Sequence, residues 1–253
     1  MAEVSTRHRC HLPAADAGDS IALRSVSRCE SVSGDPSILG VILSHGHPDH
    51  YGLIGEVHGS IPRYLGEATQ RILAEAEFFS PFGVSIPPGG FLVDRQPLEI
   101  GPFRVTPYLV DHSAFDSYAL MVEGGGRRLF YSGDLRAHGR KGALFEQLLS
   151  TPPKGVDVLL LEGTNLRSHG SKAGLSESRI ETECVEAWAG TKGIALACYS
   201  PQNTDRLVTL SRAARRPGRV FVMDLYAATI ARATGRRGLS TIGSSPADGA
   251  DWA

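Results

Sequence analysis

Three histidines and one aspartate fall within six consecutive positions of the stretch VILSHGHPDHYG, residues 41–52. His45 and His47 are two positions apart, so an extended backbone would point both imidazoles to the same side. Asp49 and His50 follow a proline, where a turn can carry them to a neighbouring position. Imidazole and carboxylate together suit zinc or manganese better than calcium or magnesium. The cluster therefore predicts a metal site.

A pair of metal ions needs ligands from outside this loop, and two candidates stand in matching contexts. His112, in VDHSAFDS, directly follows the apolar stretch FRVTPYLV, and Asp134, in YSGDLRAHG, directly follows RRLFY. Each lies at the expected end of a strand and precedes a loop, where functional sites are usually built. Alone, His112 is better explained as a hydrogen-bonded histidine and Asp134 as a turn residue. Together with the histidine cluster they become candidate ligands.

The segments that must hold these residues are mostly short apolar or alternating runs separated by turn residues, which predicts strands. Three consecutive glycines between two of the runs predict a hairpin turn. The run VDVLLLEG is apolar on both faces and predicts a central strand. The predicted strands cover residues 37–44, 90–94, 103–110, 117–123, 127–133 and 156–163, and helical spacing predicts helices over 66–79 and 142–150.

After Ser176 the pattern changes to alternating helix and strand, which predicts parallel strands joined by crossover helices. A capped helix over 176–190 is expected to turn its apolar residues inward, namely Ile180, Cys184, Val185 and Trp188. Further helices are predicted over 204–216 and 226–234, and strands over 193–198 and 218–224. Residues 1–35 are expected to be irregular, and the small-residue-rich residues 237–253 to form a disordered tail.

Composition adds little about partners. The 26 basic and 27 acidic residues give a formal net charge of −1, so bulk charge argues for neither nucleic acid nor a membrane. The N-terminus lacks the apolar core of a signal peptide, and no run is long enough to cross a bilayer. Four scattered cysteines fit a reducing compartment. We therefore expect a cytoplasmic protein. Five later arginines are candidates for contact with a nucleic-acid backbone, although a solvated helix face better explains most of them: Arg206, Arg212, Arg215, Arg216 and Arg219.

Taken in order, the motifs SHGHPDH, DHSAFDS, YSGD and LLLEGT resemble the metallo-β-lactamase fold. The stretch LLLEGTNL, followed by YSPQNTDRLVTLSRAARRPGRVFVMDLY, resembles its β-CASP branch, which contains ribonuclease J and the cleavage-and-polyadenylation endonuclease. The resemblance implies an incomplete αββα sandwich over residues 36–175. A partial α/β segment of β-CASP type would follow over residues 176–236.

The same resemblance implies two zinc ions, with manganese as an alternative. One ion would be held by His45, His47 and His112, the other by Asp49 and His50, and Asp134 would bridge the pair. Glu162 matches the acidic residue that opens the β-CASP section, where it supports a histidine of the inserted domain. Asp49, Asp134 and Glu162 are therefore the expected catalytic residues. The implied reaction is hydrolysis of an RNA phosphodiester, with single-stranded RNA as the expected substrate, by metal-activated water.

Other functions stay open from the sequence. A small-molecule hydrolase could use the same scaffold for a lactam, thioester or lactone, although LLLEGT and the α/β segment count against it. A non-catalytic RNA-binding module is a third possibility. The resemblance also implies opening strands and a final histidine ligand that the sequence does not show, because His138 and His169 lack the expected context. The chain is thus also interpretable as truncated at both ends, with an incomplete second metal site and little or no activity.

Overall fold

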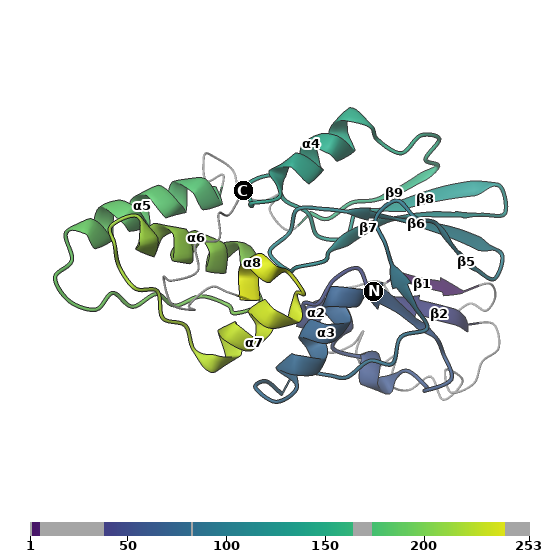
Figure 1. Ribbon diagram of the computed structural model, residues 1–253. Helices are drawn as coiled ribbons and strands as arrows, with labels where there is room; N and C mark the ends of the chain where they lie inside the picture. The colour runs from purple at the N-terminus through teal and green to yellow at the C-terminus, as the bar shows by residue number, and fades with distance from the viewer. Residues whose placement is uncertain (1, 6–37, 82, 164–173, 241–253) are drawn as a thin grey trace, which may run out of the picture.

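The computed structural model describes residues 2–5, 38–81, 83–163 and 174–240 of the chain (Figure 1). The first sheet has the strand order β1-β2-β3-β4, in which β1 is antiparallel to β2 and the other pairs are parallel. Its strands are β1 (Ala2–Ser5), β2 (Ile38–Ile42), β3 (Arg63–Gly66) and β4 (Gly90–Leu92). The prediction of an irregular N-terminal segment is therefore wrong for β1, which completes an edge of this sheet. The rest of that segment lies outside the described residues.

The second sheet has the order β5-β6-β7-β8-β9 and is antiparallel except for the parallel pair β8 and β9. Its strands are β5 (Leu98–Ile100), β6 (Phe103–Leu109), β7 (Tyr118–Gly124), β8 (Arg127–Tyr131) and β9 (Val158–Leu160). Gly124 pairs with Arg127, so the glycine triplet forms the predicted hairpin turn. Gly125 and Gly126 have φ values of 58° and 73°, in the region that glycine adopts without steric cost.

The two sheets face each other, with helices on both outer faces (Figure 1). Alternation along β7 shows the layering, because Tyr118 and Leu120 pack between the sheets while Ala119 and Met121 face the other way. The outer layers are α2 (Pro48–Tyr51), η2 (Ile54–Glu56) and α3 (Glu67–Ala76) on the first sheet and α4 (Gly142–Ser150) on the second. The predicted αββα sandwich is confirmed.

The segment after residue 174 forms a lobe beside the sandwich, at the left of Figure 1. Its helices are α5 (Glu177–Ala189), α6 (Thr204–Arg215), α7 (Leu225–Ala233) and α8 (Arg237–Ser240). Helix α7 packs on α3 of the sandwich through Ile72, Ala76, Ile230 and Ala233. The predicted disordered tail in fact begins with α8, and residues 241–253 lie outside the described part. No helix in the described ranges is long and apolar enough to cross a membrane.

The predicted strands 193–198 and 218–224 are not strands in the structure. Both are extended, but no described segment forms a ladder with either of them. Phe221 and Met223 pack beside α6, whereas Leu196 and Val220 on the outer side are 94% and 82% exposed. Apolar alternation specifies a strand's faces, but a strand also needs a neighbour to receive its backbone hydrogen bonds. Among the described residues that neighbour is missing.

Two burial predictions are also wrong. Strand β9 lies at the edge of its sheet in the described structure, and Leu159 is 58% exposed, where a central strand was expected. Helix α5 buries Glu177 and Glu181, while Trp188 and the other residues of its apolar stripe are only half-buried. The reason is that arginine side chains face those two glutamates, so the charged side of α5 turns inward.

Candidate metal centre

His45 follows strand β2 and is fixed by the ends of both sheets. The amide of Leu43 donates to the carbonyl of Tyr64 at 2.8 Å, and the amide of Tyr118 donates to the carbonyl of Ser44 at 2.9 Å. The His45 side chain is 1% exposed, with its Nδ1 3.1 Å from Ser44 Oγ. These contacts leave the other ring nitrogen, Nε2, directed at the centre of the cluster.

Helix α2 positions the second half of the motif. His47 stands at the N-cap with extended backbone angles, and Pro48 occupies the first helical turn, where its missing amide proton has no cost. The helical turn places Asp49 and His50 beyond the end of the strand. The His50 side chain is 14% exposed and that of Asp49 is 75% exposed. The predicted turn after the proline is therefore a short helix.

Asp134 follows strand β8 through a left-handed turn at Gly133, whose φ is 56°. A Cβ atom there would lie 2.8 Å from the carbonyl oxygen of Tyr118, so only glycine fits without displacement. The segment that follows β9 also holds this loop, because Glu162 Oε1 accepts a hydrogen bond from the amide of Leu135 at 2.6 Å. In this structure Glu162 supports the Asp134 loop, and it belongs to neither ligand cluster of the described residues.

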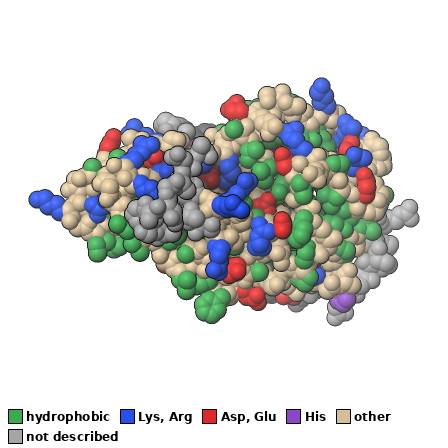
Figure 2. Space-filling model, viewed as in Figure 1, with side chains coloured by type: hydrophobic (Ala, Val, Ile, Leu, Met, Phe, Trp, Pro, Cys, Tyr) green, Lys and Arg blue, Asp and Glu red, His purple; other side chains and the backbone are tan. Residues whose placement is uncertain are grey.

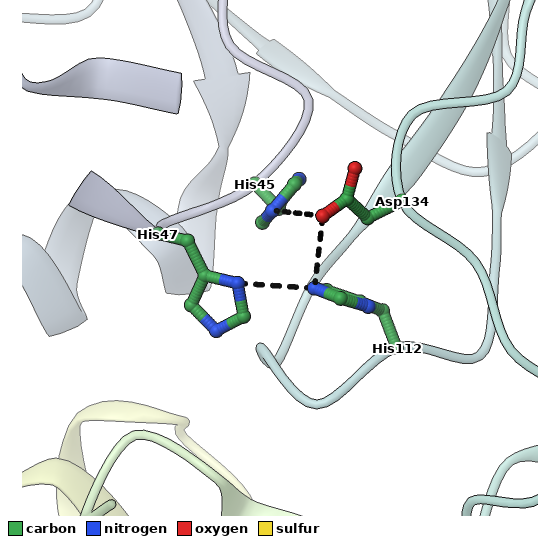
Figure 3. Close-up of side chains that lie close together, drawn as sticks. All are labelled: His45, His47, His112 and Asp134. Atoms are coloured by element: carbon green, nitrogen blue, oxygen red, sulfur yellow. Dashed lines mark hydrogen bonds and ion pairs between the residues drawn. The ribbon is translucent and has the colours of Figure 1, made fainter. Parts of the chain in front are cut away.

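Four of the predicted ligands converge from three loops (Figure 3). His45, His47, His112 and Asp134 each offer one ligand atom, and these atoms all lie within 4.8 Å of one another. His112 Nε2 is 3.0 Å from His47 Nδ1. Asp134 Oδ2 lies 3.7 Å from His45 Nε2 and 3.8 Å from His112 Nε2. Three imidazoles and a carboxylate with their ligand atoms this close together are a donor set that could hold a metal ion.

A second cluster contains Asp49, His50 and again Asp134. His50 Nε2 lies 3.4 Å from Asp134 Oδ1 and 3.6 Å from Asp49 Oδ2. The two oxygens of Asp134 therefore face different clusters, which is the geometry that a bridging carboxylate needs. The sequence predicted these two groupings, and the structure brings both together.

The ring nitrogens of the cluster are better suited to coordinate a metal ion than to hydrogen-bond with one another. Within the described residues, His45 Nε2 and His50 Nδ1 are buried and have no hydrogen-bond partner. Burial lowers the pKa of His45 and of His47, and burial with the neighbouring His47 lowers the pKa of His112 to about 3. These three imidazoles are therefore neutral at pH 7, as metal ligation requires.

Sequence reasoning missed the residues that fix the His112 loop. Asp116 Oδ2 accepts hydrogen bonds from the amides of Ala68 and Thr69, at 2.9 and 3.1 Å, and so caps the N-terminus of α3. At the other end of the loop, Lys141 Nζ donates to the carbonyl of His112 at 3.0 Å. The DHSAFDS motif thus supplies one candidate ligand and one helix cap, and a capping carboxylate 48 positions away leaves no local pattern.

A buried charge network connects this loop to helix α6. Asp111, with a fully buried side chain, accepts from Arg136 Nε at 3.3 Å. Arg136 Nη2 and Lys141 Nζ both donate to Asp205 on α6, at 2.5 and 2.9 Å. Burial raises the pKa of Asp111, and the charges of Arg136 and Lys141 oppose that shift. Lys141 therefore links Asp205, a residue of the second lobe, to the backbone carbonyl of His112.

The network continues between α5 and α6. Glu177 accepts from Arg206 and from Thr209 Oγ1, the latter at 2.6 Å. Burial acts to raise the pKa of Glu177, but these hydrogen bonds outweigh it and the pKa is lowered. Arg140 bonds Glu181 on the same helix. Paired charges therefore join α5 to α6, and join both helices to the sandwich through Arg136, Arg140 and Lys141.

Of the two later histidines, neither joins a described ligand cluster. His138 lies beside Gly174, and its carbonyl accepts from the amide of Glu177 at 3.0 Å, so it contributes to the junction with α5. His169 lies outside the described residues. The second cluster therefore has two residues besides the shared carboxylate of Asp134 within the described part of the chain.

Comparison with known proteins agrees with this geometry. Residues 15–194, well over half of the chain, match the β-lactamase superfamily domain. The chain belongs to the metallo-β-lactamase superfamily. Ribonuclease J of Mycobacterium tuberculosis is 28% identical over 204 residues, which cover 72% of this chain and 33% of that protein. Ribonuclease J of Sinorhizobium meliloti is 24% identical over 194 residues, 74% of this chain and 34% of that protein.

An uncharacterized protein of Mycobacterium bovis is 30% identical over 197 residues, covering 71% of this chain and 68% of that protein. Among solved structures, a protein of unknown function from Enterococcus faecalis superposes with a TM-score of 0.65 at 22% identity, over 76% of this chain and 48% of that one. The chain spans about a third of the length of the ribonuclease J relatives. The predicted membership of a metallo-β-lactamase-fold hydrolase family, with ribonuclease J as a distant relative, is confirmed.

Proposed function

We propose that this chain binds two zinc ions and hydrolyses phosphodiester bonds of single-stranded RNA in the cytoplasm. The observation that best supports this proposal is the placement of Asp134, whose two oxygens face two clusters of ligand-type residues. The distant likeness to ribonuclease J supports RNA as the substrate class. In this proposal residues 36–175 are the hydrolase domain and residues 176–236 a partial β-CASP-type segment.

The proposed ligands are His45, His47 and His112 for one ion, Asp49 and His50 for the other, and Asp134 for both. When bound, the metal pair would activate water as the nucleophile and neutralise charge on the phosphate. His45 and His112 are already in the protonation state that metal binding requires, because burial keeps their imidazoles neutral before a metal ion binds.

Asp49 has a separate role in this proposal. Its carboxylate is 75% exposed, while the side chains of Asp134 and His50 beside it are 25% and 14% exposed. An exposed carboxylate at the mouth of the site can orient the attacking water and accept its proton. Glu162, whose Oε1 binds the amide of Leu135, keeps the Asp134 loop in place. Manganese remains the alternative metal, since it shares the same nitrogen and oxygen ligands.

Metal analysis of the purified chain, paired with a substrate comparison, tests the proposal. The variants are His45→Ala and Asp134→Ala, and His58→Ala is the control, because His58 is exposed and its ring hydrogen-bonds with Ser60, outside both ligand clusters. We expect about two zinc ions per chain in the wild type and the control. His45→Ala should lower the metal content, Asp134→Ala should lower it further, and both should abolish RNA cleavage.

Four outcomes would contradict the proposal in different ways. Zinc content that neither substitution changes would show that the clusters are not the metal site. Turnover of a chromogenic lactam by a metal-loaded chain that leaves RNA intact would identify a small-molecule hydrolase. RNA retention without cleavage, unaffected by either substitution, would identify a binding module. If manganese restores cleavage to a chain that zinc leaves inactive, the metal assignment alone is wrong.

A further inference from the structure

A pocket of about 470 Å³ lies where the His112 loop, helix α6 and the α7–α8 turn meet. Its volume is in the range of small-ligand sites. Its basic lining residues are Lys141, Arg212, Arg215, Arg236 and Arg237. Basic side chains gather near the middle of the face in Figure 2, where α7 and α8 lie in Figure 1. The pocket therefore unites arginines that are far apart in the sequence.

The charges of Arg212 and Arg236 are not cancelled by an acidic residue of the pocket lining. The one acidic lining residue is Asp205, and it already accepts hydrogen bonds from Arg136, Lys141 and the amide of Arg140. Among the described residues, no carboxylate forms an ion pair with Arg212 or with Arg236, although both are exposed. An excess of positive charge in a hollow attracts anions more strongly than the same charge on a convex face.

The pocket also adjoins the candidate metal centre. Lys141, one of its lining residues, donates to the carbonyl of His112 at 3.0 Å. Phe115, another, lies three positions after His112 in the same loop. The pocket and the candidate metal centre therefore share the His112 loop as a common element. The interpretation of Arg212 and Arg215 as a solvated helix face is replaced by a lining role.

Guanidinium groups bind phosphate through paired hydrogen bonds, and apolar surface beside them accommodates a base. The pocket has both, since Val208, Leu239 and the half-buried ring of Phe115 line it together with the arginines. We propose that it binds a nucleotide of the RNA strand, with Arg212 and Arg236 on the phosphate. This inference rests on the proposed function, because it assigns a subsite for that same substrate.

The test measures binding of a fluorescent single-stranded RNA to the whole chain by anisotropy, with chelator present to prevent cleavage. The double variant R212Q/R236Q is compared with R127Q/R232Q, which removes equal charge from side chains that are 81% and 71% exposed outside the pocket. Loss of the contacts to one phosphate should lower the steepness of log affinity against log salt by about 0.7, the contribution of one neutralised phosphate on a single strand. The control should keep the wild-type slope.

A second readout separates this inference from the proposed function. Hydrolysis of bis(p-nitrophenyl) phosphate by metal-loaded protein should be unchanged in R212Q/R236Q, because that small diester does not need the pocket. A wild-type salt slope in R212Q/R236Q, in a chain that does cleave RNA, would overturn the subsite alone. Absence of RNA binding by the wild type would overturn the subsite and the RNA assignment together. Equal slope changes in both double variants would show only diffuse attraction and would also overturn the subsite.

Discussion

Asp205→Asn is the sharpest test of how the two parts of the molecule are joined. The residue is 5% exposed and accepts three hydrogen bonds, from Arg136 Nη2, Lys141 Nζ and the amide of Arg140. Two of these donors are cationic, and their side chains are only 13% and 21% exposed. Replacing the carboxylate with an amide leaves the mostly buried Lys141 ammonium facing a neutral group, whereas Arg136 keeps its ion pair with Asp111.

The size of the effect follows from these contacts. Removing one partner of a buried ion pair costs about 3–5 kcal/mol, because the other charge stays buried without compensation. The amide oxygen of asparagine can still accept one of the hydrogen bonds, so we expect the lower end of that range, about 3 kcal/mol. With a urea slope near 3 kcal/mol/M, the unfolding midpoint should fall by about 1 M.

The assay is urea unfolding of the metal-free chain, followed by fluorescence and circular dichroism, with chelator present so that metal binding adds no stability. Glu99→Gln is the matched control, since it makes the same change in an exposed pair, 3.4 Å from Arg104. That control should cost less than about 1 kcal/mol. If Asp205→Asn costs no more than Glu99→Gln, the network does not hold α6 to the sandwich and the reasoning is refuted.

Two further predictions concern the metal centre. The pKa values of His45 and His112 lie below the usual 6.5 in the folded chain, so the unfolded state binds more protons below that pH. Metal-free protein should therefore lose stability as the pH falls from 7 to 5, by up to about 1.4 kcal/mol per pH unit for each histidine, and a flat urea midpoint would contradict this. Gly133→Ala combines a left-handed backbone with a Cβ 2.8 Å from a carbonyl oxygen, so it should cost about 1–3 kcal/mol and lower zinc content. Gly126→Ala shares the backbone penalty but has no atom within 4 Å of the new Cβ, and its zinc content should equal that of the wild type.

Local pattern was sufficient for most strands and helices of the sandwich, although not for β1, β3 or β5, and the αββα arrangement itself was implied by the resemblance of the motifs. Alternation along residues 118–124 fixed which side chains lie between the sheets, since a strand's faces follow from its period of two. The apolar spacing of α3 likewise appears as a helix with Ile72, Leu73 and Ala76 buried. The candidate ligands could be predicted for a related reason, because each stands at the end of a strand where chemistry-bearing loops begin.

The local sequence pattern failed where the structure of a segment depends on the segment that faces it. Residues 193–198 and 218–224 have the alternation of strands, yet they form no ladder in the described structure because hydrogen bonding between strands needs a neighbour. Helix α5 has an apolar stripe that is only half-buried, because Arg140 and Arg206 draw Glu177 and Glu181 inward. A stretch of sequence specifies its own periodicity, but the charge or backbone that faces it lies elsewhere in the chain.

By itself, the sequence identified the candidate ligand residues through their types and short spacings, and its motifs carried the resemblance that implied the family and the two groupings that share Asp134. Only the tertiary structure decided what stands around them. Asp116 as the cap of α3, Asp205 as the anchor of Arg136, and the arginine pocket beside the His112 loop all join positions dozens of residues apart. Such contacts arise from packing between elements, and no local pattern of residues encodes them.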